Sequence, residues 1–242
     1  NTAFQQLQEA EKSHPDNYQL KTALADIYVM QEKYQQAETV LLPLIGKDKP
    51  AVARRLGYSN LVRSYAYEGR YRETYRMLDE LINSYWQTKD TANAAYSQVI
   101  KALFIILTDD VNSSWNEVKK TLPFQKSLKG KIYWNALGLY YVYYQDYDKA
   151  ESIAKSDSNK RWYYIIITLI HTNKNELLEA ESLANTLMLT KPEPFQILSN
   201  YHLAKCEFEN GQLDKAEKNL LLLQNTYDNT YGFRSWYYPR SF

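Results

Sequence analysis

A short phrase of sequence recurs along this chain, and it constrains the fold more than any other feature does. The phrase consists of an aromatic residue or leucine, two polar residues, a small residue, and then a polar or aromatic residue. Its copies occupy residues 34–38, 71–75, 147–151, 177–181 and 213–217, with a weak copy at 2–4. The small residue of each copy serves as its marker, and the markers are Ala3, Ala37, Thr74, Ala150, Ala180 and Ala216.

Successive markers lie 34, 37, 76, 30 and 36 residues apart, and the interval of 76 corresponds to two units of 38. Self-similarity with a period of about 20 to 50 residues is the sequence signature of a repeat architecture, in which each repeat is one supersecondary unit. We therefore expect each phrase to open the second helix of a helical pair.

A second pattern precedes the markers, and it is clearest before Ala150. There Trp134, Leu137, Gly138 and Tyr141 follow the spacing W-x2-L-G-x2-Y. Degenerate copies precede three other markers, at Leu24-Ala25-x-x-Tyr28, Leu61-Val62-x-x-Tyr65 and Leu203-Ala204-x-x-Glu207. Late prolines, Pro15 and Pro192, each follow a marker by 12 residues. In these features the chain resembles the tetratricopeptide repeat (TPR) family, whose pattern is W-x2-L-G-x2-Y, then alanine, then a late proline.

The geometry of helix packing agrees with this resemblance. A small residue at a helix crossing lets two helix axes approach, while neighbouring leucine and tyrosine side chains fill the groove between ridges. Gly69 and Gly211 lie between the helices of their pairs, where a residue in the left-handed conformation ends the first helix. Asp16 or Asn17 is expected to cap the helix that holds Leu20 and Leu24.

The resemblance implies an all-α fold, a right-handed α-solenoid of TPR-like helix-turn-helix repeats that forms one domain over residues 1–242. The expected units are a half repeat at 1–15, repeats at about 17–50, 54–87, 88–125, 130–158, 160–194 and 196–229, and the start of a further repeat at 231–242. The unit at 88–125 matches by position alone. It predicts a helix from Thr91 to Leu107, a turn over 109–112, and a helix capped by Ser113 or Ser114 that runs to Leu122.

Composition narrows the classes of function. Lys and Arg number 29 against 28 Asp and Glu, a net charge of +1, which provides no basic field for binding nucleic acid. Gly and Pro together make up 14 of 242 residues, which favours helices. The longest apolar-rich run, Trp162–Ile170, is shorter than the roughly 20 residues that span a bilayer, so no direct membrane insertion is expected. A single cysteine leaves the compartment open.

Residues that carry chemistry form no recognisable active-site or metal motif, so we expect no enzyme activity, no cofactor and no metal site. His14, His171 and His202 lack metal-ligand spacing; His171 is expected to pack at a helix crossing and His202 to be solvated. Cys206 is expected to be a buried small apolar residue. The carboxylate pairs Asp109-Asp110 and Asp146 with Asp148 are interpreted as turn and cap residues rather than as an acid/base pair.

The resemblance to TPR proteins also implies a function, because in that family the first helices of the pairs line a concave groove that binds peptides or protein partners. Mapped on this chain, the groove-facing residues are Asp26, Met30, Arg63, Tyr67, Lys101, Phe104, Asn135, Leu139, Tyr143, Leu169, Tyr201, Lys205 and Phe208. An extended peptide would place side chains against the rings while Arg63, Lys101 and Lys205 meet its carbonyls or carboxylates. The Lys and Asn clamp for a C-terminal carboxylate, found in one TPR variant, is absent, since those positions hold Thr22, Asp26, Ser59 and Arg63.

Two functions stay open at this stage. One is a scaffold that holds a protein or peptide partner, and the other is a ligand-sensing regulatory domain that controls an attached kinase or DNA-binding domain. The closing run, residues 232–242, resembles a segment of TPR arrays in bacterial signalling proteins. We expect the chain to be cut from something longer, and the apolar rings Phe233, Trp236, Tyr237, Tyr238 and Phe242 to be able to drive a homodimer.

Overall fold

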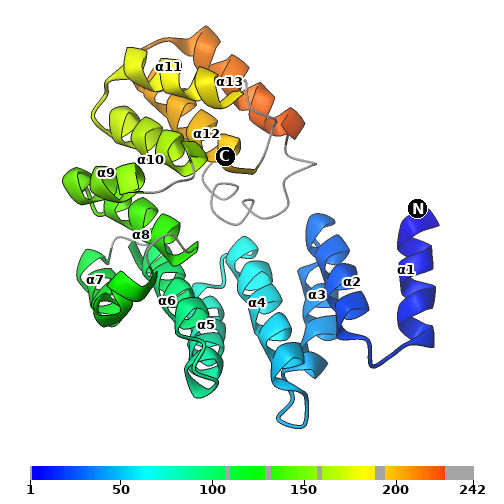
Figure 1. Ribbon diagram of the computed structural model, residues 1–242. Coiled ribbons are helices and arrows are strands. Elements are labelled where there is room, and N and C mark those ends of the chain that lie inside the picture. The colour runs from blue at the N-terminus through cyan, green and yellow to red at the C-terminus, as the bar shows by residue number, and fades with distance from the viewer. Residues whose placement is uncertain (1, 107–109, 129–131, 157–159, 189–193, 227–242) are drawn as a thin grey trace. The chain divides into compact units, whose positions relative to one another are not determined.

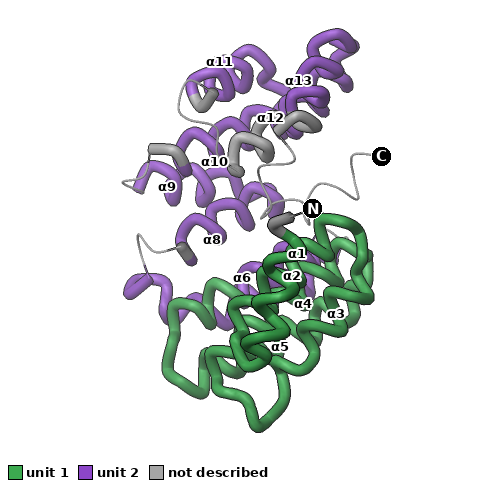
Figure 2. Tube along the Cα trace, turned by 90° about the vertical axis from the view of Figure 1, so that its right-hand side faces the viewer, with its two compact units in different colours: residues 1–97 green, residues 98–242 purple. Residues whose placement is uncertain are grey.

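The computed structural model describes residues 2–106, 110–128, 132–156, 160–188 and 194–226, which form helices joined by turns, with no strand among them. Figure 1 shows the succession of helices along the chain. The contacts divide the chain into two compact units, residues 1–97 and 98–242, so that the division falls inside one helix (Figure 2). The predicted all-α class is thereby confirmed for the described residues.

Unit 1 consists of helices that pack on their neighbours in the sequence. They are α1 (Thr2–Ser13), α2 (Tyr18–Met30), α3 (Tyr34–Leu41), the 3-10 helix η1 (Leu42–Ile45), α4 (Ala51–Tyr67), α5 (Tyr71–Gln87) and the first part of α6 (Thr91–Ile106). Helix α2 packs on α1 and α3, and α4 packs on α2, α3, η1 and α5. Helix α4 therefore contacts its own second helix, α5, and both helices of the pair before it.

Unit 2 repeats this packing. It holds the rest of α6, then α7 (Val111–Lys119), η2 (Leu122–Leu128), α8 (Ile132–Tyr143), α9 (Tyr147–Ser156), α10 (Lys160–Asn173), α11 (Leu177–Met188), α12 (Pro194–Glu209) and α13 (Leu213–Thr226). Helix α10 contacts α8, α9, α11 and α12, and α12 contacts α10, α11 and α13. The alternation of first and second helices thus continues through this unit.

The recurring phrase fixes where the second helices begin. Helices α3, α5, α9, α11 and α13 start at Tyr34, Tyr71, Tyr147, Leu177 and Leu213, three residues before their markers. Their five markers are all buried. Gly138 shows why a small residue stands before Tyr141, because a Cβ atom there would come within 2.6 Å of Ile166 Cδ1 and 3.1 Å of Ile153 Cγ2. The equivalent residues of the other pairs, Ala25, Val62, Thr168 and Ala204, are buried as well.

The turns inside the pairs share a conformation that sequence reasoning found in only two of them. The residue five positions before each marker has a positive φ, and these residues are Glu32, Gly69, Gln145, Asn175 and Gly211. Glycine adopts this left-handed conformation without strain, whereas other residues carry a modest cost. In every one of these turns the next residue donates a backbone hydrogen bond of 2.8 or 2.9 Å to the carbonyl nine positions before the marker. The turn is therefore defined by its backbone bond rather than by glycine.

The second helix of the irregular unit differs from its prediction. Helix α7 ends at Lys119 rather than at Leu122, and it is capped by Asp110, whose carboxylate accepts a 2.9 Å hydrogen bond from the amide of Ser113. Ser114 lies inside the helix, fully buried, and its hydroxyl donates to the Tyr140 hydroxyl at 3.0 Å. The cap was misplaced because three neighbouring residues, Asp110, Ser113 and Ser114, all belong to cap-forming types. Elsewhere α2 is capped by Asn17, one of the two residues predicted for this role.

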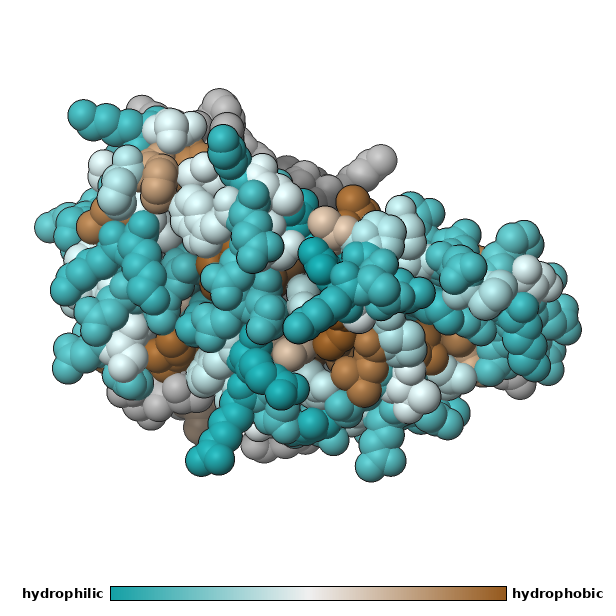
Figure 3. Space-filling model, turned by 90° about the horizontal axis from the view of Figure 1, so that it is seen from below, coloured by the Kyte–Doolittle hydropathy of each residue, from teal (hydrophilic) through white to brown (hydrophobic). Residues whose placement is uncertain are grey.

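Figure 3 shows one face of the molecule, on which hydrophilic side chains predominate and apolar residues form patches between them. The predicted start of a further repeat at 231–242, together with its aromatic rings, lies outside the described residues, as do Leu107, Asp109 and Pro192. The arrangement of the pairs as a right-handed solenoid stays a prediction.

Candidate functional site

The predicted groove residues of unit 1 meet between α2 and α4. Arg63 forms a 2.9 Å ion pair with Asp26 and also donates to the side-chain oxygen of Asn60. Arg63 and Asp26 are both partly exposed. Tyr67, one turn further along α4, is buried, whereas groove binding would need an accessible ring. In unit 1 the structure therefore places a charged pair, rather than an open aromatic ring, at the predicted surface.

The predicted residues on α6 are also engaged within their unit. Lys101 Nζ lies 3.4 Å from Glu117 of α7, and it is only 11% exposed. Glu117 also pairs with Lys120 at 2.7 Å and accepts a hydrogen bond from Gln98. Phe104 is buried. Burial of Lys101 and Phe104 does not fit an open groove at α6, and Glu117, which organises this cluster, was not singled out from the sequence.

On α8 and α12 the structure brings predicted residues together. The Tyr143 hydroxyl and Nε2 of His202 form a 3.0 Å hydrogen bond, and their ring centroids are 5.9 Å apart. The Tyr201 ring meets the imidazole edge-on, with centroids 5.5 Å apart. All three side chains are partly buried. We call Tyr143, Tyr201 and His202 the α8–α12 aromatic site.

His202 was expected to be only solvated, so its place in this site is a correction. Tyr143 and His202 lie 59 positions apart in the sequence, so local sequence patterns could not predict their contact. The order of the repeats could have indicated this contact. Helix α10 packs on both α8 and α12, and first helices that share a neighbour can bring their side chains together.

The other predicted site residues lie elsewhere. Asn135 on α8 is partly buried, while Leu139 and Leu169 are buried in the core. Lys205 is exposed and lies 3.7 Å from Glu209 on its own helix. Phe208 is 64% exposed and lines an apolar groove with residues of α13, rather than joining the α8–α12 aromatic site.

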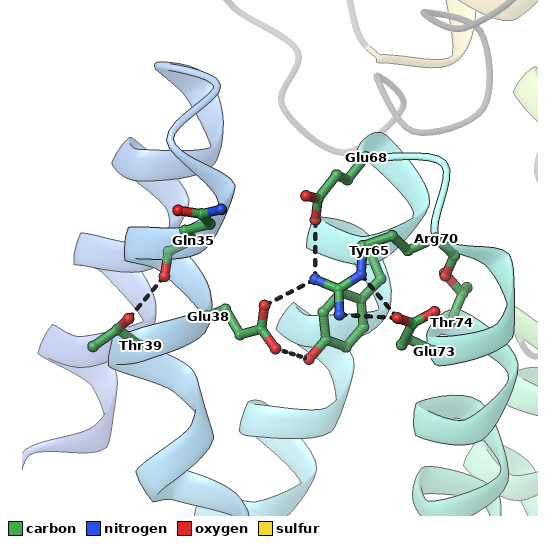
Figure 4. Close-up of polar contacts among 8 residues, drawn as sticks. All are labelled: Gln35, Glu38, Thr39, Tyr65, Glu68, Arg70, Glu73 and Thr74. Carbon is green, nitrogen blue, oxygen red and sulfur yellow. Dashed lines mark hydrogen bonds and ion pairs between the residues drawn. The ribbon is translucent and has the colours of Figure 1, made fainter.

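A second polar cluster joins successive helical pairs in unit 1 (Figure 4). The Tyr65 hydroxyl donates a 2.6 Å hydrogen bond to Glu38, and Arg70 donates to the other oxygen of the same carboxylate at 2.9 Å. Arg70 also bonds Glu68 and Glu73 and lies over the Tyr65 ring, 4.4 Å from its centroid. Burial alone would raise the pKa of Glu38, but the bonds from Tyr65 and Arg70 outweigh it and lower that pKa. We interpret this cluster as a structural joint between pairs.

Two titratable groups on α12, Glu207 and Cys206, have raised pKa values, in contrast to Glu38. Glu207 is buried, and Asn219 donates to its two carboxylate oxygens at 3.0 and 2.8 Å. Burial, with the charge of Glu181 acting in the same direction, raises the pKa of Glu207. Cys206 is buried, as predicted, and burial raises the pKa of its thiol, which keeps it in the unreactive neutral form. His171 is partly exposed, and its Nδ1 contacts Glu176.

Chemically, the α8–α12 aromatic site offers two phenol rings and an imidazole, which suit the recognition of apolar side chains and of hydrogen-bonding groups.

Among the residues that the structure describes, no three His, Cys, Asp or Glu side chains gather as a metal site would require. No described helix combines the length and the apolar character needed to cross a membrane. Comparisons with protein-family models, with curated proteins and with solved structures found no match for this chain.

Proposed function

We propose that this chain is a non-catalytic module that binds a protein or peptide partner on the face formed by its first helices. The observation that carries the proposal is the α8–α12 aromatic site. On two first helices, His202 contacts both Tyr143 and Tyr201, and all three side chains keep part of their surface accessible.

The arrangement of the pairs supports a TPR-like right-handed α-solenoid as the scaffold. The same turn, with a positive φ five residues before the marker, closes five pairs, and the markers of those pairs are buried. Repeats of this kind stack through neighbour contacts and expose an extended binding surface. That is the property a binding module needs.

The chemistry of the first-helix face suits an extended peptide. Partly buried aromatic rings supply contact area at low entropic cost, and residues of this kind are enriched among the anchors of protein interfaces. A peptide that combines an apolar side chain with a hydrogen-bonding group fits the two phenol rings and the imidazole of the α8–α12 aromatic site.

The test begins with a random peptide library displayed on phage and selected against the full chain. Affinities of the selected peptides are then measured by fluorescence anisotropy for the native chain and for Tyr143→Ala and His202→Ala. The matched control is Lys155→Ala, an exposed change on the second helix α9. Circular dichroism verifies that every variant is folded.

We expect each site variant to weaken binding about tenfold or more, which corresponds to about 1.4 kcal/mol, a size typical of interface anchors. Lys155→Ala should bind as the native chain does. Equal binding by the native chain and both site variants, or the absence of any enriched peptide, would overturn the assignment of this face.

A further inference from the structure

Helix α13 exposes an apolar face that is covered on α3, α5, α9 and α11. In those helices the residue four positions after the marker is buried, and these residues are Leu41, Leu78, Ala154 and Ala184. The equivalent residue of α13, Leu220, is 38% exposed, and Leu221 beside it is 49% exposed. Leu213, at the start of α13, is 59% exposed. Exposed apolar residues that gather in this way, rather than singly, mark an interaction surface.

The exposed leucines of α13 belong to one groove, which we call the α13 groove. Its volume is about 370 Å³, and the described residues that line it are Phe208, Leu213, Ala216, Glu217, Leu220 and Leu221. The members on α13 are spaced i, i+3, i+4, i+7 and i+8, which places them along one helical stripe. Phe208 of α12 is 64% exposed and lies beside this stripe. The groove therefore offers an apolar surface about two helical turns long.

A helix with one apolar side fits this surface. Helix α3 packs on α4, α9 on α10, and α11 on α12, so each of these second helices is covered by the first helix of the pair that follows. Side chains spaced four residues apart on one helix form ridges that pack into the grooves of another. We therefore expect the occupant of the α13 groove to be an amphipathic helix.

The charge of the α13 groove specifies the polar residues of that helix. Glu217 is the one charged side chain among the described lining residues, and it has no ion-pair partner in the described part of the chain. Asp214, three positions earlier, lies on the same side of α13 and is exposed. Lys215 is held by Glu181, and Lys218 does not line the groove. A Lys or Arg on the occupant would complement the carboxylate of Glu217.

The same carboxylate argues against a second copy of this chain as the occupant. Two copies related by a two-fold axis would pair α13 with itself in antiparallel orientation. Glu217 lies midway between Leu213 and Leu221, so the register that pairs these two leucines brings both copies of Glu217 to the axis. Like charges in such close juxtaposition oppose association.

We propose that the α13 groove binds a basic amphipathic helix of a partner protein. The apolar side of that helix packs against Phe208, Leu213 and Leu220, and a Lys or Arg next to that side pairs with Glu217. The groove shares no residue with the α8–α12 aromatic site. The proposal therefore stands independently of peptide binding at that site.

The test uses a synthetic helical peptide with leucines on one side and lysines on the other, and a second peptide in which glutamates replace the lysines. Fluorescence anisotropy measures the binding of each labelled peptide to the whole chain, below the concentration at which the peptides self-associate. We expect the lysine peptide to bind about tenfold more tightly than the glutamate peptide, because only lysine complements Glu217.

The apolar contact is tested with two exposed leucines. Leu213→Gln and Leu220→Gln should each weaken binding of the lysine peptide about fivefold or more, since each removes an apolar anchor. The matched control is Leu178→Gln, the same change at a leucine of α11 that is 77% exposed and lies outside the groove, and it should bind as the native chain does. Circular dichroism verifies that every variant is folded.

The charge is tested by reversal. Glu217→Lys should remove the preference for the lysine peptide, whereas Glu179→Lys, the same change at an exposed site on α11, should preserve it. Tyr143→Ala should leave both affinities unaltered, which separates the α13 groove from the α8–α12 aromatic site.

Three results would overturn the proposal: no binding of the lysine peptide, native affinity in both groove-leucine variants, or an unchanged preference in Glu217→Lys. Sedimentation velocity of the native chain identifies the competing occupant. We expect no dimer that depends on the groove, and a dimer that Leu220→Gln dissociates would assign the groove to a second copy instead.

Discussion

Two joints between helical pairs, one in each unit, occupy the same places in the repeat and differ in their chemistry. In unit 1, Tyr65 stands nine residues before its marker, is 1% exposed, and donates to Glu38 of the preceding pair. In unit 2, the same place holds Glu207, which is also 1% exposed. The residue of the preceding pair that corresponds to Glu38 is Glu181, and its charge raises the pKa of Glu207. The fold thus fixes the burial of this position, and the side chain decides whether that burial stabilises the joint.

The cations of the two joints differ as well. Arg70 is shared by Glu38, Glu68 and Glu73 and stacks on Tyr65. Lys215 forms a 2.6 Å ion pair with Glu181, and it is 55% exposed. A networked guanidinium can hold several carboxylates in fixed geometry, whereas an exposed ammonium pair is screened by water and salt. We therefore expect the joint in unit 1 to be the stronger one.

The largest expected effect comes from placing the unit 2 residue in the unit 1 joint. Tyr65→Glu sets a buried carboxylate against Glu38 and should destabilise unit 1 by about 3 kcal/mol, because an uncompensated buried charge is costly. Amide exchange within α4 and α5 measures the loss. Tyr65→Phe, which removes only the hydroxyl, should cost about 1 kcal/mol. Equal losses in the two variants would mean that the joint depends on the Tyr65 hydroxyl, which both variants remove, and that the added carboxylate costs nothing further.

A smaller effect of opposite sign is expected at Glu207. The folded state binds the proton of the Glu207 carboxyl more tightly than the unfolded chain does. Stability therefore falls as pH rises through the raised pKa, and the ionised carboxylate destabilises unit 2 at neutral pH. Glu207→Gln removes this charge while keeping an oxygen that accepts from Asn219. It should stabilise unit 2 at pH 7 by about 1 kcal/mol, the size of one poorly compensated buried polar group.

The pH profile separates this cause from better packing. The gain of Glu207→Gln should vanish as the pH falls below 4.5, the ordinary value for this carboxyl, where the native side chain is neutral in both states. Exchange in α12 and α13, compared at fixed denaturant and two pH values with intrinsic rates corrected, gives the measurement. A gain that persists undiminished in acid would contradict the electrostatic explanation.

The smallest effects are expected from removing the cations of the two joints, Arg70 and Lys215. Arg70→Ala should cost about 0.5 kcal/mol and lose part of that cost in high salt, since its partners form a partly exposed network. Lys215→Ala should be close to neutral. Urea unfolding followed by exchange in each unit checks both. A larger loss for Lys215→Ala than for Arg70→Ala would reverse the ranking of the two joints.

Much of the fold was predictable because local rules repeat. The starts of five second helices followed from the recurring phrase, and the buried markers followed from the need for a small residue at a helix crossing. The cap of α2 at Asn17 and the left-handed glycines Gly69 and Gly211 followed from the same logic. The cap of α7 was misplaced, because adjacent Asp and Ser residues compete for that role and only the chain's path selects one.

The candidate site was predictable only in part. The repeat frame assigned Tyr143 and Tyr201 to first helices, but it gave no reason to join them through His202, which lies 59 residues from Tyr143. It also predicted that Tyr67 and Phe104 line the groove, although both are buried. Helical periodicity shows which side chains share a face, but exposure depends on what packs over that face.

The sequence by itself determined the helical pairs, their period and the two turns that contain Gly69 and Gly211, because these follow from interactions between residues that are close along the chain. Only the tertiary structure decided that Tyr143 meets His202, that Glu38 receives Tyr65 and Arg70, and that Glu207 is buried beside the charge of Glu181. Those contacts join residues more than 25 positions apart. Their geometry depends on how whole helices pack, a sum of many small contacts that no single motif records.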